Sequence, residues 1–130
     1  MSYISSYYHC VFSTKERRPL LPSGLSERLW PYLGGIARQN RMKAIAVGGM
    51  PDHVHILLFL PSTLSIAKAL QLIKGGSSKW VHDNFPEHWR FGWQVKCSAE
   101  RVAGYQGCGL PGHLQFLYVV QEGEAALVHQ

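Results

Sequence analysis

Apolar residues alternate with polar ones over three stretches of the chain, which predicts strands that bury one face. Residues 3–14 (YISSYYHCVFST) are rich in aromatic and β-branched side chains that alternate along the segment. Residues 42–50 (MKAIAVGGM) and 53–60 (HVHILLFL) repeat the pattern, and only Pro51-Asp52 separates them. So short a link favours a hairpin-like antiparallel pair.

Two other stretches have apolar residues at helical spacing. The first helix is predicted from Leu25 to Arg41, where Pro31 must sit in the first turn or kink the helix. Its apolar stripe consists of Leu29, Leu33, Ile36 and Ala37. The second lies within residues 62–85, with Ser62 or Thr63 as its N-cap and a possible break at Gly75-Gly76. Its stripe consists of Ile66, Leu70, Ile73 and Trp80.

A fourth strand is predicted around Phe91 to Val95, after an aromatic-rich loop. The order is then strand, helix, strand, strand, helix, strand. This order is typical of an α+β, ferredoxin-like (RRM-like) antiparallel sheet with two helices packed on one face. At 130 residues the chain has the length of one domain.

Positive charge is concentrated in one part of the chain. The formal net charge is +5 and the pI about 9.3, which favours a polyanionic partner such as nucleic acid. All 13 Lys and Arg residues lie between Lys15 and Arg101 together with six acidic residues, a net +7, whereas residues 102–130 carry a net −2. The tail therefore differs in composition from the rest.

Three cationic positions cluster in KERRP, residues 15–19, a basic loop at a strand end. On the second helix Lys68 and Lys79 fall on nearly the same side, with Ser78 close by. That spacing suits contacts to a phosphate backbone, and it equally suits a solvated helix face.

The cysteines and the hydropathy pattern bear on the compartment. Cys10, Cys97 and Cys108 are odd in number and form no CxxC pair, so we interpret them as free thiols. No apolar run approaches the roughly 18 residues that span a bilayer, and the N-terminus has no signal-like core. We expect a soluble, intracellular protein.

MPDHVHILLFL, residues 50–60, carries the candidate chemistry. In a strand His53 and His55 share a face, and imidazoles about 7 Å apart along a strand can converge on one cation. Asp52 is placed to orient one of the rings from outside the metal shell. The alternative is that both are hydrogen-bonded sheet residues.

Imidazole suits Zn, Mn, Fe, Ni and Cu, whereas Mg prefers oxygen. A third ligand must come from elsewhere in the chain. The remaining histidines have no partner at metal-ligand spacing and are interpreted as surface or core residues: His9, His82, His88, His113 and His129.

Four segments in this order resemble the single-tyrosine HUH transposases, the small insertion-sequence and REP-associated kind. The segments are YHCVFSTKERRPLL, MPDHVHILL, LIKGGSSKW and FGWQ, and the resemblance covers about residues 7–94. We expect a single transposase-like domain over 1–130, in which 1–94 matches the family and 95–130 is atypical.

The resemblance implies a homodimer formed by pairing sheets, and a single-stranded DNA hairpin as the partner. It implies that His53 and His55 hold a Mg or Mn ion that polarises the scissile phosphate. A tyrosine then attacks to give a 5′-phosphotyrosine link and a free 3′-OH, so that strands are cleaved and rejoined. The cations expected to hold the DNA phosphates are Lys15, Arg17, Arg18, Lys68, Lys74 and Lys79. A bacterial-type cytoplasmic, nucleoid-associated location follows.

Beyond FGWQ the family pattern fails. Family members continue with a glycine-aromatic-glycine turn, a Ser-rich strand and a helix that carries the tyrosine. Here Tyr118 is the preferred nucleophile, 63 residues after His55, with Glu122 at i+4 as third metal ligand if the segment is helical. Gln121 is the alternative ligand and Tyr105 the alternative nucleophile.

A frameshift near residues 95–100 is one hypothesis for the mismatch, and it predicts a degenerate copy that has lost its nucleophile. Two other function classes stay open. A noncatalytic RRM-like module could bind single-stranded nucleic acid by stacking. A Zn-dependent hydrolase would cleave phosphodiesters without a covalent intermediate.

Overall fold

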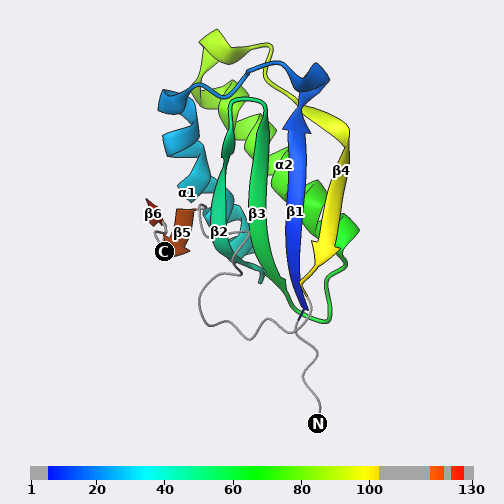
Figure 1. Ribbon diagram of the computed structural model, residues 1–130. Helices are drawn as coiled ribbons and strands as arrows, with labels where there is room; N and C mark the ends of the chain where they lie inside the picture. Colours follow the sequence, from blue (N-terminus) through cyan, green and yellow to red (C-terminus); the bar gives the residue numbers. More distant parts are fainter. Residues whose placement is uncertain (1–5, 103–117, 122–123, 128–130) are drawn as a thin grey trace.

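The computed structural model describes residues 6–102, 118–121 and 124–127, and within these ranges six strands form one antiparallel sheet in the order β4-β1-β3-β2-β5-β6 (Figure 1). The strands are β1 (Ser6–Thr14), β2 (Lys43–Met50), β3 (His53–Leu60), β4 (Trp93–Arg101), β5 (Tyr118–Gln121) and β6 (Glu124–Leu127). The helices are α1 (Ser23–Gln39) and α2 (Ile66–Asn84), and the short 3-10 turns are η1 (Lys15–Arg17) and η2 (Pro86–His88).

The first four strands and the two helices follow the predicted order, and both helices lie on the same side of the sheet (Figure 1). The predicted α+β, ferredoxin-like fold is therefore confirmed. The turn at Pro51-Asp52 joins β2 and β3 as an antiparallel pair, with Met50 opposite His53. The helices thus cover one face of the sheet, and the opposite face carries the second set of side chains.

The side chains of β3 distinguish the helix-covered face of the sheet from the opposite face. Val54, Ile56 and Leu58 are fully buried and pack in the main core with both helices. Leu57, on the opposite face, is also fully buried, beside Ala46 of β2. His53 and His55 share that second face, so it is polar near the start of β3 and apolar further along, as the sequence pattern predicted.

Helix α1 runs through Pro31, which is its ninth residue. Of the two alternatives predicted for this proline, a place in the first turn is therefore excluded. Pro31 has no N–H to donate to the carbonyl of Glu27, one turn earlier. Burial of six side chains of α1, Leu29 and Leu33 among them, offsets this loss.

Helix α2 differs from its prediction in two ways. Its N-cap is Ser65, whose hydroxyl accepts from the backbone N–H of Lys68 at 3.1 Å, and not Ser62 or Thr63. The helix is also unbroken at Gly75-Gly76. A Cβ at position 76 would lie 3.1 Å from Cδ1 of Ile36, so this glycine serves the close approach of α1 and α2.

The fourth strand is longer than the predicted 91–95, because it extends to Arg101 along β1. Its side chains from Cys97 to Glu100 are exposed, so buried and exposed residues do not alternate there.

The atypical C-terminal segment adds the β5-β6 hairpin to the sheet. β5 pairs with the free side of β2, where Tyr118 lies opposite Val47 and Val119 opposite Ala46.

Candidate metal and nucleic-acid site

The two histidines of β3 meet on the face of the sheet opposite the helices. The ring centroids of His53 and His55 are 4.9 Å apart and the ring planes are nearly perpendicular. β3 positions them because it is held on both sides, by β1 opposite Ser13 and Val11 and by β2. The prediction that both rings point the same way from one strand is confirmed.

Asp52 holds the ring of His53. Nδ1 of His53 lies 2.8 Å from Oδ1 of Asp52. The hydrogen bond from His53 is the main reason that the pKa of the Asp52 carboxyl lies below its usual value, with a smaller contribution from Arg17. The carboxylate is therefore ionised, and Nδ1 of His53 is the donor in this contact.

His9 holds the ring of His55, a contact that the sequence analysis missed. Nε2 of His9 lies 3.0 Å from Nδ1 of His55, and the two rings stack with centroids 5.2 Å apart. In the register of the sheet His9 lies opposite Leu57 and Val11 opposite His55, so the two histidines are diagonal neighbours across β1 and β3. Alternation along β1 places His9 on one face, but only the register brings it to His55.

The environment also sets the charge of His55. Burial, then the neighbouring His53 and His9, lower the pKa of His55 to about 4. The ring is therefore neutral near neutral pH, which is the state in which imidazole binds a metal ion. The contacts to Asp52 and His9 both use Nδ1, so coordination through Nε2 of each ring would keep both contacts.

In the part of the chain that the structure describes, no group of three His, Cys, Asp or Glu side chains could hold a metal ion. Glu122 and Tyr105 lie outside the described residues. Tyr118 begins the strand β5, so the helical condition for placing Glu122 at i+4 on the side of Tyr118 is not met at Tyr118–Gln121. Two consecutive valines after Tyr118 favour the strand, and Gln121 ends it.

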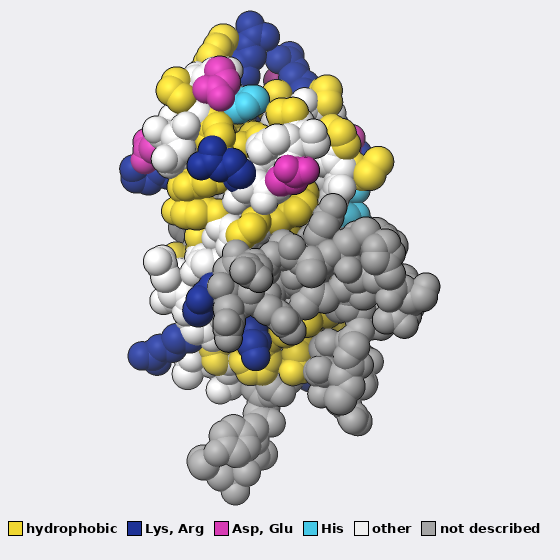
Figure 2. Space-filling model, turned by 90° about the vertical axis from the view of Figure 1, so that its left-hand side faces the viewer, with side chains coloured by type: hydrophobic (Ala, Val, Ile, Leu, Met, Phe, Trp, Pro, Cys, Tyr) yellow, Lys and Arg dark blue, Asp and Glu magenta, His cyan; other side chains and the backbone are white. Residues whose placement is uncertain are grey.

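The basic loop Lys15, Arg17 and Arg18 lies beside the histidines. An Arg17 Nη2 atom is 3.4 Å from Oδ2 of Asp52, the carboxylate that also binds His53. Arg18 pairs with Glu16 at 3.0 Å. The loop therefore joins the candidate metal site to the end of the molecule where β1 leads into η1 (Figure 1). Lys and Arg side chains also gather at this upper end in Figure 2.

The three lysines of α2 do not form one surface with this loop. Lys68 and Lys79 are exposed on the outer side of the helix, and Lys79 pairs with Asp83 at 2.7 Å. Lys74 instead faces β4, where its Nζ donates to the carbonyls of Gln94 at 2.5 Å and Val95 at 3.1 Å. Of the six predicted DNA-binding cations, only Lys15, Arg17 and Arg18 lie together.

No helix among the described residues is long and apolar enough to cross a membrane.

The fold and the site thus define a ferredoxin-like domain with an oriented histidine pair beside a basic loop. Residues 2–104 match the model of the family described as "Transposase IS200 like", which is most of the chain, and this chain belongs to that family. The match ends at residue 104, somewhat beyond the residue 94 at which we expected it to end.

Relatives by sequence include two insertion-sequence proteins. The ISDra2 transposase TnpA of Deinococcus radiodurans is 31% identical over 80 residues, which cover 62% of this chain and 57% of the relative. The transposase for insertion sequence element IS200 of Salmonella typhimurium is 26% identical over 78 residues, covering 60% and 51%. The chain thus spans little more than half the length of the curated relatives it matches.

Solved structures share the fold. A crystal structure described as a candidate transposase from Deinococcus radiodurans R1 has a TM-score of 0.71 and 28% identity, covering 80% of this chain and 82% of that one. A REP-associated tyrosine transposase bound to a REP hairpin has a TM-score of 0.58 and 17% identity, covering 81% and 61%. The second likeness concerns the fold alone.

Proposed function

We propose that this chain is the DNA-processing domain of a transposase, which binds single-stranded DNA with hairpin ends and cleaves and rejoins strands through a 5′-phosphotyrosine intermediate. A divalent metal ion, Mg or Mn, would be held by His53 and His55. The protein would act as a homodimer formed by pairing sheets, on DNA of the nucleoid in the cytoplasm.

The observation that carries the proposal is the histidine pair itself. Two imidazoles converge on the face of the sheet opposite the helices, with ring centroids 4.9 Å apart, and each is held at Nδ1 by a neighbour. Metal-binding histidines characteristically have their second nitrogen engaged in this way. The donor set present fits Mn better than Mg, because imidazole is a softer ligand than oxygen.

Each group of residues at the site has its own role in the proposed strand cleavage. Asp52 and His9 fix the rings of His53 and His55, and the basic loop binds the phosphates that flank the scissile bond. A divalent ion held by His53 and His55 would stabilise the charge on the phosphate oxygens. A tyrosine oxygen forms the new bond to phosphorus while the bond from phosphorus to the 3′ oxygen breaks. The phenolic proton leaves the tyrosine, and the 3′ oxygen takes up a proton to become the 3′-OH.

The nucleophile is assigned to Tyr118, with Tyr105 as the alternative. For Tyr118 the structure gives the position of the backbone. It pairs with Val47, whose neighbour Gly48 pairs with His55, so that β5 lies two strands from β3, about 10 Å away. Glu122 is the proposed third ligand, and Gln121 the alternative.

A suicide DNA substrate tests the proposal by trapping the covalent intermediate. Wild-type protein with Mn should become covalently linked to the 5′ end of the cleaved strand, as seen by a mobility shift on denaturing gels. His53→Ala or His55→Ala should reduce this product at least 100-fold, whereas His88→Gln should not change it. If the adduct forms equally well in the double variant His53→Ala/His55→Ala, the proposed role of the pair is wrong.

Tyrosine variants then assign the nucleophile. Tyr118→Phe should abolish the adduct, while Tyr105→Phe should leave it intact. The opposite result would move the assignment to Tyr105. Loss in neither variant would exclude both tyrosines.

A noncatalytic single-stranded nucleic-acid-binding module is the second candidate. It is favoured by the position of Tyr118 in a strand and by the absence of a third metal ligand among the described residues. Hairpin binding without any covalent product would establish it.

Reading the other two frames of the coding DNA past FGWQ tests the frameshift hypothesis, which is wrong if neither frame restores a tyrosine-containing helix. Metal-dependent cleavage without a protein-DNA link would instead favour the hydrolase.

A further inference from the structure

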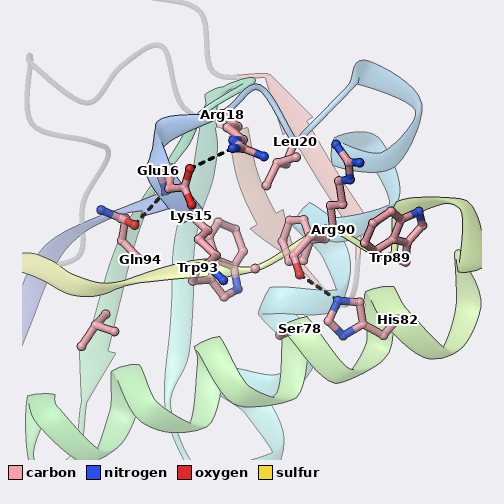
Figure 3. Close-up of a pocket in the computed structure, with 13 residues that line it drawn as sticks. Lys15, Glu16, Arg18, Leu20, Ser78, His82, Trp89, Arg90, Trp93 and Gln94 are labelled. Carbon is pink, nitrogen blue, oxygen red and sulfur yellow. Dashed lines mark hydrogen bonds and ion pairs between the residues drawn. The ribbon is translucent and has the colours of Figure 1, made fainter.

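A cavity of about 760 Å³ opens beside the basic loop (Figure 3). It lies between the η1 loop, the C-terminal half of α2 and the segment 89–95 that leads into β4. Its volume falls in the range of about 300–1,000 Å³ that is typical of small-molecule sites. Neither the family's metal chemistry nor the nucleophile requires it.

An exposed tryptophan forms one wall of this cavity. Trp89 has 68% of its surface exposed, which is uncommon for so large an apolar side chain. The guanidinium carbon of Arg90 lies 4.7 Å from the centre of its ring. Arg90 therefore lies over the indole ring, and much of the Trp89 surface still remains exposed.

Neighbouring contacts hold Trp89 at this position. Phe85 and Phe91, four residues before it and two residues after it, are buried in the core. The ring nitrogen Nε2 of His82 lies 2.7 Å from the carbonyl oxygen of Phe91 (Figure 3). The backbone segment that presents Trp89 is thus anchored at both ends.

The charge of the cavity is positive. Lys15, Arg18 and Arg90 line it, and Glu16 is the single acidic residue among the lining residues. Glu16 is already paired with Arg18 at 3.0 Å. The lining therefore carries a net charge of +2 next to an exposed aromatic ring, a combination that suits a ligand with both a planar ring and a phosphate.

The loop over the cavity is held in an unfavourable backbone conformation. Glu16 and Arg17 have φ angles of 58° and 54°, in the left-handed region that few non-glycine residues adopt. The backbone N–H of Glu16 donates to Oε1 of Gln94 at 2.8 Å, and that of Lys15 to the carbonyl of Gly92 at 2.8 Å. Strain that the surrounding structure maintains in this way is typical of ligand-binding segments.

The same loop connects the cavity to the histidine pair. Lys15 and Arg18 face the cavity, while Arg17 reaches Asp52, the partner of His53. A single DNA strand that crosses the loop could therefore contact both places at once.

We propose that this cavity receives one unpaired nucleobase of the bound DNA, stacked on Trp89, with the adjoining phosphates held by Lys15, Arg18 and Arg90. This inference rests on the proposed function, because it assumes a DNA strand at the histidine pair. It adds a site that reads a base outside the duplex, at a defined distance along the strand from the point of cleavage.

The test is a binding experiment with two labelled DNA hairpins of one sequence, measured by fluorescence anisotropy. One hairpin carries four unpaired thymidines at each end, and the other has blunt ends. An abasic nucleotide then replaces each unpaired thymidine in turn. Trp89→Ala is compared with Trp89→Phe, and Arg90→Gln with Arg38→Gln, which removes the same charge from the exposed end of α1.

One abasic position should weaken binding to the wild-type protein about 5- to 100-fold, the range expected for one base stacked on an aromatic ring. Trp89→Ala should weaken binding of the flanked hairpin by a similar factor and remove the abasic penalty at that position, because the base and the ring form one contact. Trp89→Phe should retain most of the affinity. Arg90→Gln should weaken binding more than Arg38→Gln.

Equal effects of Trp89→Ala on flanked and blunt hairpins, or no effect on either, would overturn the nucleobase site while leaving the proposed function intact. Failure of the wild-type protein to bind either hairpin would refute the proposed function and, with it, this inference. Tighter binding of the same sequence as RNA, with the same dependence on Trp89, would reassign the site to RNA.

Discussion

His55 and His82 illustrate how the surroundings of an imidazole decide its chemistry. Burial first, and then the neighbouring imidazoles of His53 and His9, lower the pKa of His55 to about 4 and keep the ring neutral. His82 is exposed on α2, and its Nε2 contacts the carbonyl of Phe91, where it supports the segment before β4. Only the first of these environments prepares a histidine to bind a metal ion.

His9 should act as a positioning residue for the metal site. His9→Ala removes the contact to Nδ1 of His55 without removing a proposed ligand. We expect Mn affinity to fall about 10- to 100-fold, the usual cost of losing a group that orients a ligand. Isothermal titration of the protein with Mn, without DNA, measures this directly.

His88→Gln is the matched control, because His88 lies on η2 and its nearest charged partner is Glu87, at 4.0 Å. His9→Gln keeps a hydrogen-bonding group at position 9 and should recover part of the affinity. Unchanged Mn binding in His9→Ala would mean that His9 does not orient His55 for a metal.

At the scale of elements, two glycines occupy opposite environments. A Cβ on Gly49 in β2 would lie 2.2 Å from the carbonyl oxygen of His53, a backbone atom that cannot move aside, whereas a Cβ on Gly75 in α2 would meet nothing within 4 Å. Gly49→Ala should therefore destabilise the β2-β3 hairpin by about 1–3 kcal/mol. Gly75→Ala should stabilise the protein by about 0.5–1 kcal/mol, because alanine favours a helix.

Urea unfolding of the two variants beside the wild type checks both signs, since the midpoint should fall for Gly49→Ala and rise for Gly75→Ala. A lower midpoint for Gly75→Ala would show that the glycine has a packing role that its open surroundings do not suggest.

The elements differ in how well the sequence predicted them. β3 was predicted with its exact bounds, because both faces of the strand carry a clear pattern and Pro51 and Pro61 flank it. β4 was predicted too short, because an edge strand with exposed side chains has no alternation. The continuity of α2 was missed because the fit of Gly76 against Ile36 is a tertiary contact.

The candidate site likewise has one part that the sequence predicts and another that only the tertiary structure reveals. His53, His55 and Asp52 are neighbours in sequence, so strand geometry alone predicted their arrangement. His9 lies 46 residues from His55 and joins it only through the register of β1 on β3, which the sequence does not reveal. The cavity at Trp89 combines η1, α2 and the start of β4, and its strained loop has no sequence signature.

Over the whole molecule, positive charge matters by its position more than by its amount. Among the described residues Lys15 has no acidic partner within ion-pair distance, whereas Lys79 is paired with Asp83 at 2.7 Å. The hydrogen bond and charge of Asp83 raise the pKa of Lys79, so this lysine is fully charged but already partly neutralised by its neighbour. The net charge of +5 therefore does not show which cations are available to bind DNA, and the basic loop is the more favourable place.

This difference should appear in the salt dependence of DNA binding. A cation that contacts a phosphate displaces a counterion, so its loss lowers the slope of log affinity against log salt by about one. Lys15→Gln should lower the slope by about one, whereas Lys79→Gln and the control Arg38→Gln should leave it nearly unchanged. Hairpin binding measured by anisotropy between about 50 and 200 mM salt gives the slopes. A slope lowered by about one in both Lys15→Gln and Lys79→Gln would place the DNA on the outer side of α2 as well as on the loop. The DNA path would then have to run along that helix, and not from the histidine pair over η1 toward Trp89.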